Sequence, residues 1–84
     1  MHSYTTKGVC SKKIDFDIVD NKVTNVHFLG GCDGNLQGLS VLIEGMDINE
    51  AIKKLRGIHC GRKSTSCPDQ LSKALEEAIN TVND

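Results

Sequence analysis

The chain has 84 residues, a formal net charge of -1, and few aromatic side chains: two Phe, one Tyr and no Trp. This length suits one small domain over residues 1–84, and the near-neutral charge excludes the broad positive field that holds nucleic acid or an anionic membrane. No apolar run is long enough to span a bilayer, and the polar start MHSYTTKG lacks the apolar core of a signal peptide. We therefore expect a cytoplasmic protein with no membrane partner.

The first part of the sequence predicts an antiparallel sheet of three strands. Residues 4–9 are rich in Thr, Tyr and Val, which favours an edge strand. Residues 13–19 (KIDFDIV) alternate between apolar and acidic side chains, as a half-buried strand does. Asp20-Asn21 is typical of a two-residue hairpin turn, and residues 23–29 (VTNVHFL) follow as the return strand.

Two helices are predicted to follow the sheet. Apolar residues at helical spacing define the first, which Gly45 ends: Leu36, Leu39, Leu42 and Ile43. The second begins at the capping box DINE, with Asp47 as the N-cap, and Gly57 ends it. Its apolar stripe contains Ile48, Ala51, Ile52 and Leu55.

A third helix is predicted from Pro68 onward, because proline suits the first helical positions. Cys67 is then the expected N-cap, with Ser66 as the other candidate. One apolar face follows over three turns: Leu71, Ala74, Leu75, Ala78, Ile79 and Val82. The whole pattern predicts an α+β domain in which three helices pack on one face of a three-stranded antiparallel sheet.

Four cysteines fall at predicted strand ends or in loops: Cys10, Cys32, Cys60 and Cys67. In a reducing compartment, such residues are more often metal ligands or redox groups than structural disulfides. No Cys-x-x-Cys pair is present, so the fold must bring the thiols together. A thiol at a helix N-terminus meets unpaired N–H groups that favour thiolate, the form that binds metal. The prediction is a metal site of these four cysteines.

Two further groups of residues are candidates for binding. His59 directly precedes Cys60 and is an additional candidate ligand, whereas His27 lies in mid-strand and is expected to face solvent. The stretch GGCDGN precedes a predicted helix, and its backbone N–H groups offer an alternative site for an anion or a nucleotide phosphate. The residues of that anion site would be Gly30, Gly31, Gly34 and Asn35.

The stretch STSCPDQL matches the motif that gives the TSCPD domain family its name, and GGCDGN is similar to a second characteristic stretch of that family. The resemblance covers nearly the whole chain. It implies a stand-alone relative of the C-terminal module of cobalamin-dependent ribonucleotide reductases. A complete reductase needs a large barrel and a radical-generating cofactor, so we expect an accessory module whose partner is a reductase or another redox enzyme, and no enzyme on its own.

The order of elements also resembles the IscU/NifU-like scaffolds for iron–sulfur cluster assembly, where Cys10, Cys32 and Cys67 match in order and context. Lys12 departs from the aspartate of the scaffolds. A fourth cysteine favours a closed site that holds zinc or an iron–sulfur cluster. The alternatives are a thiol redox module, with Cys60 and Cys67 as the nearest pair in sequence, and a nucleotide- or anion-binding module.

Overall fold

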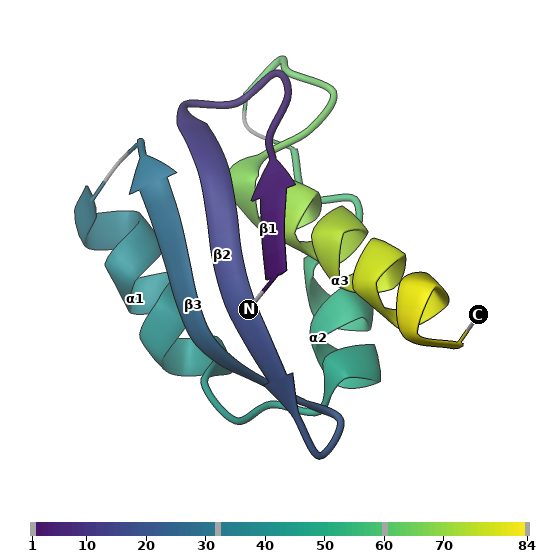
Figure 1. Ribbon diagram of the computed structural model, residues 1–84. Coiled ribbons are helices and arrows are strands. Elements are labelled where there is room, and N and C mark those ends of the chain that lie inside the picture. The colour runs from purple at the N-terminus through teal and green to yellow at the C-terminus, as the bar shows by residue number, and fades with distance from the viewer. Residues whose placement is uncertain (1, 32, 60, 84) are drawn as a thin grey trace.

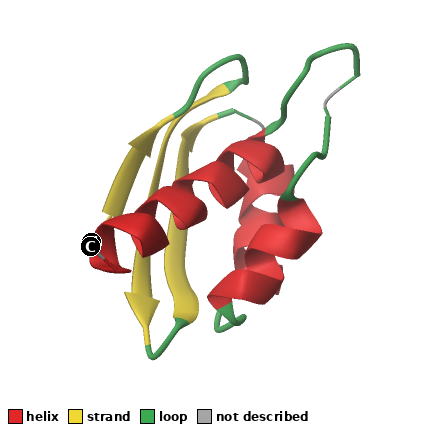
Figure 2. Ribbon diagram, turned by 90° about the vertical axis from the view of Figure 1, so that its right-hand side faces the viewer, coloured by secondary structure: helices red, strands yellow, loops and turns green. Residues whose placement is uncertain are grey.

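The chain forms a three-stranded antiparallel sheet followed by three helices in a computed structural model that describes residues 2–31, 33–59 and 61–83. The elements are β1 (His2–Thr5), β2 (Ser11–Val19), β3 (Lys22–Gly30), α1 (Asp33–Ile43), α2 (Ile48–Leu55) and α3 (Cys67–Asn83). The strands lie in the order β1-β2-β3 (Figure 1), and the helices lie on one side of the sheet (Figure 2). The predicted α+β class is confirmed, while the likeness to IscU stays a prediction.

The hairpin between β2 and β3 matches the sequence pattern closely. Asp20 and Asn21 form its turn with φ values of 52° and 64°. Two successive positive φ angles define the turn whose twist matches that of paired strands, and Asp and Asn tolerate this conformation better than most residues. The strands extend one or two residues beyond the predicted bounds, because pairing continues to Ser11 and Gly30 at the far end of the ladder.

The prediction of a first strand over residues 4–9 is wrong in its bounds. β1 ends at Thr5, and residues 6–10 form a loop. Gly8 has a φ of 73°, and the backbone N–H of Lys7 donates to Gln70 Oε1 at 3.1 Å. The Lys7 amide is therefore bonded to α3, and the chain turns at Gly8 before it enters β2.

The outer edge of β3 is partly covered near the hairpin turn by the chain that connects α1 to α2. Val23 N donates to Met46 O at 2.9 Å, and Gly45 N donates to Val23 O at 2.7 Å. Asn25 N donates to the side chain of Glu44 at 2.9 Å. These bonds occupy backbone groups that an edge strand would otherwise present to solvent.

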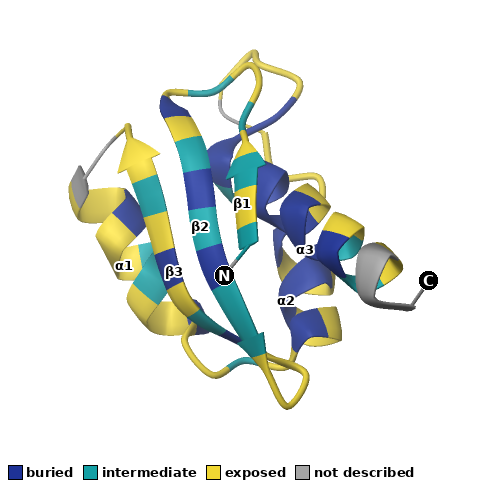
Figure 3. Ribbon diagram, in the orientation of Figure 1, coloured by how far each residue is buried: buried dark blue, intermediate teal, exposed yellow. Residues whose placement is uncertain are grey.

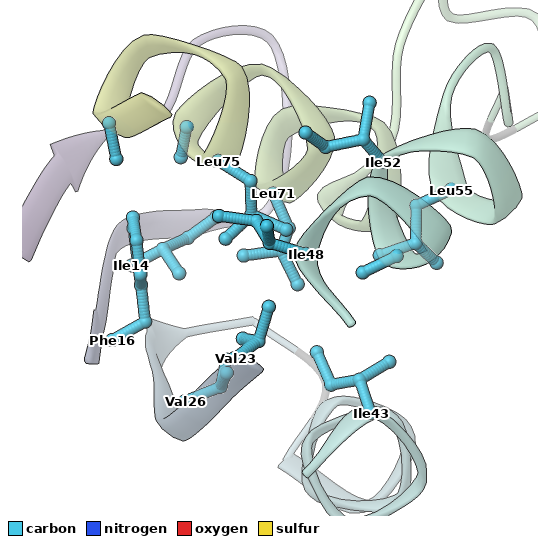
Figure 4. Packing of buried hydrophobic residues seen from close by; sticks show 13 residues of the cluster. Ile14, Phe16, Val23, Val26, Ile43, Ile48, Ile52, Leu55, Leu71 and Leu75 are labelled. Carbon is cyan, nitrogen blue, oxygen red and sulfur yellow. The ribbon is translucent and has the colours of Figure 1, made fainter. Parts of the chain in front are cut away.

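The hydrophobic core lies between the sheet and helices α2 and α3 (Figure 4). The predicted stripe of α2 is buried in full, and the side chain of Asp47 caps that helix by accepting from Asn49 N and Glu50 N. The predicted face of α3 is also confirmed as far as its side chains are described, which excludes that of Val82. Its buried residues are Leu71, Ala74, Leu75 and Ala78.

Helix α1 contributes less to the core than its sequence predicts. Leu36 and Ile43 are buried, but Leu42 is 77% exposed. The helix packs beside β3 at the edge of the sheet, so only a narrow face is covered and most of its surface is exposed (Figure 3). The expectation that Leu42 is a core residue is wrong for this reason. None of the described helices is both long and apolar enough to cross a membrane.

Buried Leu71 on α3 and exposed Leu42 on α1 together give a direct test of the core. Leu71 is 0% exposed, so Leu71→Ala should lower the free energy of unfolding by about 2–5 kcal/mol through lost burial and a residual cavity. The same change at Leu42 should alter it by less than about 0.5 kcal/mol. Urea unfolding of both variants measures the difference. Equal losses would show that α1 packs more tightly than described.

Candidate functional site

Three connections meet at one end of the domain: the β1–β2 loop, the junction of β3 with α1, and the loop from α2 to α3 (Figure 1). Strand direction explains this. Neighbouring strands are antiparallel, so the end of β1, the start of β2 and the end of β3 lie at the same end of the sheet. Cys10 lies just before β2, and Cys67 is the first residue of α3. The fold thus brings these two cysteines together.

The two thiols lie in direct contact although they are 57 residues apart in sequence. Cys10 Sγ and Cys67 Sγ are separated by 3.8 Å, which is well beyond the S–S bond length of about 2.05 Å, so no disulfide joins them. Ser11 Oγ lies 3.2 Å from Cys67 Sγ and forms a hydrogen bond with it. Cys67 is 6% exposed, whereas Cys10 is an exposed residue, so the pair lies where the interior of the domain meets its surface.

Gly31 approaches this pair closely from the end of β3. A Cβ on this residue would lie 3.2 Å from Cys10 Sγ and 2.8 Å from Leu36 Cδ1, and its φ of 87° is itself unfavourable for other residues. Glycine is therefore required here, and the residue that precedes Cys32 in the sequence lies against the Cys10 thiol.

Cys32 and Cys60 themselves lie outside the described residues. Among the residues that the structure does describe, no three His, Cys, Asp or Glu side chains form a group that could hold a metal ion. His59, the additional candidate ligand, is exposed in the loop from α2 to α3. His27 is exposed on β3, as expected. The described part of the predicted metal site is thus the pair Cys10 and Cys67.

The residues of the predicted anion site adopt two different conformations. Gly30 and Gly31 have φ values of 81° and 87°, whereas Gly34 and Asn35 belong to the first turn of α1. All four are exposed. Anion binding at this position stays a prediction.

Ser66, and not Cys67, is the N-cap of α3. The Ser66 hydroxyl accepts from Asp69 N at 3.2 Å and donates to Ile58 O at 2.6 Å, while Ser66 O accepts the first helical bond from Gln70 N at 2.8 Å. The expectation that Cys67 caps the helix is therefore wrong, since its neighbour already does so. The Cys67 sulfur instead contacts Ser11 Oγ and Cys10 Sγ.

A buried carboxylate holds this helix start in place. Asp69 is 5% exposed, and its two oxygens accept from Gly57 N at 2.8 Å and from Thr65 Oγ1 at 2.5 Å. Gln70 donates to Thr65 Oγ1 at 3.0 Å and accepts from Lys7 N, which connects the same segment to the β1–β2 loop. Every buried side-chain nitrogen and oxygen in the described part of the chain has a hydrogen-bond partner.

These bonds also set the charge state of Asp69. Burial by itself raises the pKa of the carboxyl, but the hydrogen bonds from Thr65 and Gly57 and the positive charge of Lys73 outweigh it and hold the pKa below its usual value. Lys73 Nζ lies 3.7 Å from the carboxylate. Asp69 is thus a buried anion that the folded state prefers in its ionised form.

The sequence analysis missed the polar residues that position the thiols. Ser11, Thr65, Asp69 and Gln70 are all buried. A usable signal was present, because Ser66-Cys67-Pro68-Asp69 is a capping-box pattern with an acidic residue three positions after the serine. Nothing local in the sequence indicates that Ser11 contacts Cys67, since that contact spans 56 residues.

The fold and the site define a small α+β domain in which a hydrogen-bonded polar segment places one buried thiol beside an exposed one. The model of the TSCPD domain family matches residues 2–79, and the chain belongs to this family, which is associated with ribonucleotide reductases. The family name is spelled by residues 65–69, the segment that forms the start of α3. No curated protein and no solved structure gives a significant match to the chain.

Replacing the buried carboxylate should destabilise the domain in a pH-dependent way. Asp69→Asn replaces one accepting oxygen by a donor, so we expect a loss of about 1–3 kcal/mol in the free energy of unfolding at pH 7. Because the pKa of Asp69 is lowered on folding, its stabilisation is complete above the unfolded pKa of about 3.9 and is lost as the pH falls through the folded value. The two proteins should therefore begin to converge in stability below about pH 4, and the convergence should be complete only below the lowered pKa of folded Asp69.

Urea unfolding of both proteins across this pH range measures the effect. Asp20→Asn is the matched control, because Asp20 is exposed in the hairpin turn and asparagine also tolerates its positive φ. This control should change the stability little at any pH. A loss for Asp69→Asn that does not diminish in acid would contradict the assigned role of the carboxylate charge.

Proposed function

We propose that the domain binds a metal ion through cysteine thiolates and that zinc is the favoured ion. The observation that supports this is the 3.8 Å separation of Cys10 Sγ and Cys67 Sγ. Zinc binds thiolate sulfur at about 2.3 Å in tetrahedral geometry, and two ligands of such an ion lie about 3.8 Å apart. Two thiols from distant parts of the chain therefore already have the spacing of two ligands on one ion.

The remaining ligands in this proposal are Cys32 and Cys60. Cys32 follows Gly31, whose close contact with the Cys10 thiol supports its inclusion. Cys60 lies two residues after Ile58, whose carbonyl accepts from the cap of α3. Four thiolates would form a closed site, which is typical of structural zinc. His59 is the substitute ligand if one cysteine does not bind.

Ser11 has a supporting role in this site. Its hydroxyl is 3.2 Å from Cys67 Sγ and is buried, so it would donate to the thiolate once the thiol has lost its proton. Hydrogen bonds to ligating groups orient them and offset their charge. When bound, the metal supplies stability, because a domain of this size with few aromatic residues buries little apolar surface. An iron–sulfur cluster is the alternative cofactor.

In its cellular role, we place the domain as an accessory module of a ribonucleotide reductase or of another redox enzyme. The family association with ribonucleotide reductases supports this partner class. The described residues contain a thiol pair and a hydrogen-bonded polar cluster, which suit a structural or docking role. In this proposal the module positions or stabilises its partner, and the partner performs the reduction.

A thiol redox module is the second candidate, and the same contact supports it. Among the described residues the adjacent pair is Cys10 and Cys67, in place of the pair Cys60 and Cys67 that the sequence suggested. Closing 3.8 Å to the bond length of about 2.05 Å needs only a small movement. The two thiols would lose two electrons and two protons to a disulfide substrate, which would leave as two thiols. A thiol count with and without reductant distinguishes this function from a zinc site.

Removing a ligand should remove the metal. Protein purified without oxygen should contain about one equivalent of zinc, and Cys10→Ser or Cys67→Ser should lose most of it. Chelation should lower the free energy of unfolding of the wild type by about 3 kcal/mol or more, which is the linkage expected when metal exceeds its Kd about 100-fold. Elemental analysis and urea unfolding measure both effects.

Ser66→Ala is the control for a general loss of stability. It removes the cap of α3 and should cost about 1 kcal/mol, but it removes no ligand and should retain the metal. Visible absorption distinguishes a cluster from zinc, which is colourless. The proposal fails if the anaerobic wild type contains no stoichiometric metal, or if Cys67→Ser retains it in full.

A further inference from the structure

Of the ten lysine and arginine side chains, four pair with carboxylates and six are exposed without an ion pair among the described residues. Four cations pair with carboxylates on the sheet or on helices α2 and α3: Lys13, Lys54, Arg56 and Lys73. The six that form no ion pair within residues 2–31, 33–59 and 61–83 are Lys22 and Lys53, and four at the cysteine end of the domain: Lys7, Lys12, Arg62 and Lys63. We call these last four residues the basic rim.

The basic rim lies on the segments next to the thiol pair. Lys7 and Lys12 lie three residues before and two residues after Cys10 in the sequence. Arg62 and Lys63 lie in the loop that leads to Thr65. Thr65 Cγ2 lies 3.4 Å from the point that a Cβ atom would occupy if Gly8 had one. The β1–β2 loop and the loop from α2 to α3 therefore touch, and they extend from the same end of the domain (Figures 1 and 2).

Lys12 extends the basic rim toward the end of β3. Its Cγ lies 3.7 Å from the point that a Cβ atom would occupy on Gly30, the last residue of that strand. Lys12 lies at the irregularity in the β2–β3 register between Ser11 and Lys13, and it is exposed. The rim thus includes all three connections at this end of the domain.

Exposed carboxylates gather at the opposite end. They lie at the hairpin turn, at the end of α1 and at the start of α2, and are Asp20, Glu44, Asp47 and Glu50. At the cysteine end, the described acidic side chain is that of Asp69, which is buried and hydrogen-bonded. Among the described side chains, the cysteine end thus combines four exposed cations with one buried, hydrogen-bonded carboxylate.

We propose that the basic rim is a docking surface for an acidic segment of a partner protein. Unpaired exposed cations are complementary to carboxylates, and such complementarity accelerates encounter and selects the partner. The surface extends across three connections, which suits an extended protein segment. The proposal does not rest on metal binding, because the four cations are exposed whether or not a metal is held.

Two other occupants fit the structure less well. Binding of single-stranded nucleic acid relies on aromatic side chains for stacking, and the three aromatic residues belong to the core or pack against it, namely Tyr4, Phe16 and Phe28. A small anion needs a concave site, and the cavity between β3 and α1 is lined by residues such as Asn25, Phe28 and Gln37. Neither set belongs to the basic rim.

The test uses the full chain and a synthetic peptide of alternating Glu and Ser, with a peptide of alternating Gln and Ser for comparison. Amide shifts should appear at the basic rim with the Glu peptide, and they should vanish at about 1 M salt, where the Debye length is about 3 Å. Reversing two loop cations, Arg62→Glu with Lys63→Glu, should raise the Kd about tenfold.

The matched control is Lys22→Glu with Lys53→Glu, because these cations are also exposed but lie outside the rim. This control should leave the Kd unchanged. The proposal is overturned if the Gln peptide binds as well, if the control reversal weakens binding equally, or if a single-stranded oligonucleotide or tripolyphosphate binds more tightly than the Glu peptide. Salt-sensitive self-association in sedimentation would instead assign the rim to the acidic end of a second copy, and it would also overturn the proposal.

Discussion

The hydrogen bonds to the buried Asp69 carboxylate are the interaction on which the site depends. A carboxylate removed from water is costly unless donors surround it. Here the donors are Gly57 N and the hydroxyl of Thr65, so the two ends of the loop from α2 to α3 are held at one point. That closure fixes where α3 begins. Cys67 can then lie beside Cys10 without help from a local cysteine motif.

Each of the five residues of the family motif has its own structural role in this arrangement. Thr65 donates to the carboxylate, and Ser66 caps α3 while it donates to the preceding loop. Cys67 contacts the other thiol, and Asp69 accepts from both loop ends. Pro68 lies in the first helical turn, where the missing N–H costs nothing. The start of α3 thus contains both the Cys67 thiol and the hydrogen-bonded residues that position it.

Local patterns predicted some elements of this fold well and others poorly. Helix α2 was predictable in full, because its stripe and the capping Asp47 are encoded within nine residues. Leu42 was mispredicted because helical spacing does not reveal that α1 lies at the edge of the sheet. The pairing of Cys10 with Cys67 has a sequence separation of 57, so no local rule could find it. Its recognition required the positions of three connections relative to one another.

The covered edge of β3 has a consequence for how the protein behaves when concentrated. Near the hairpin turn, the backbone groups of Val23 and Asn25 are already bonded to the chain between α1 and α2. A strand from another molecule finds no ladder to extend there. Disordered cross-β growth is therefore disfavoured along that half of the strand, and the domain gains colloidal protection from its own connecting chain.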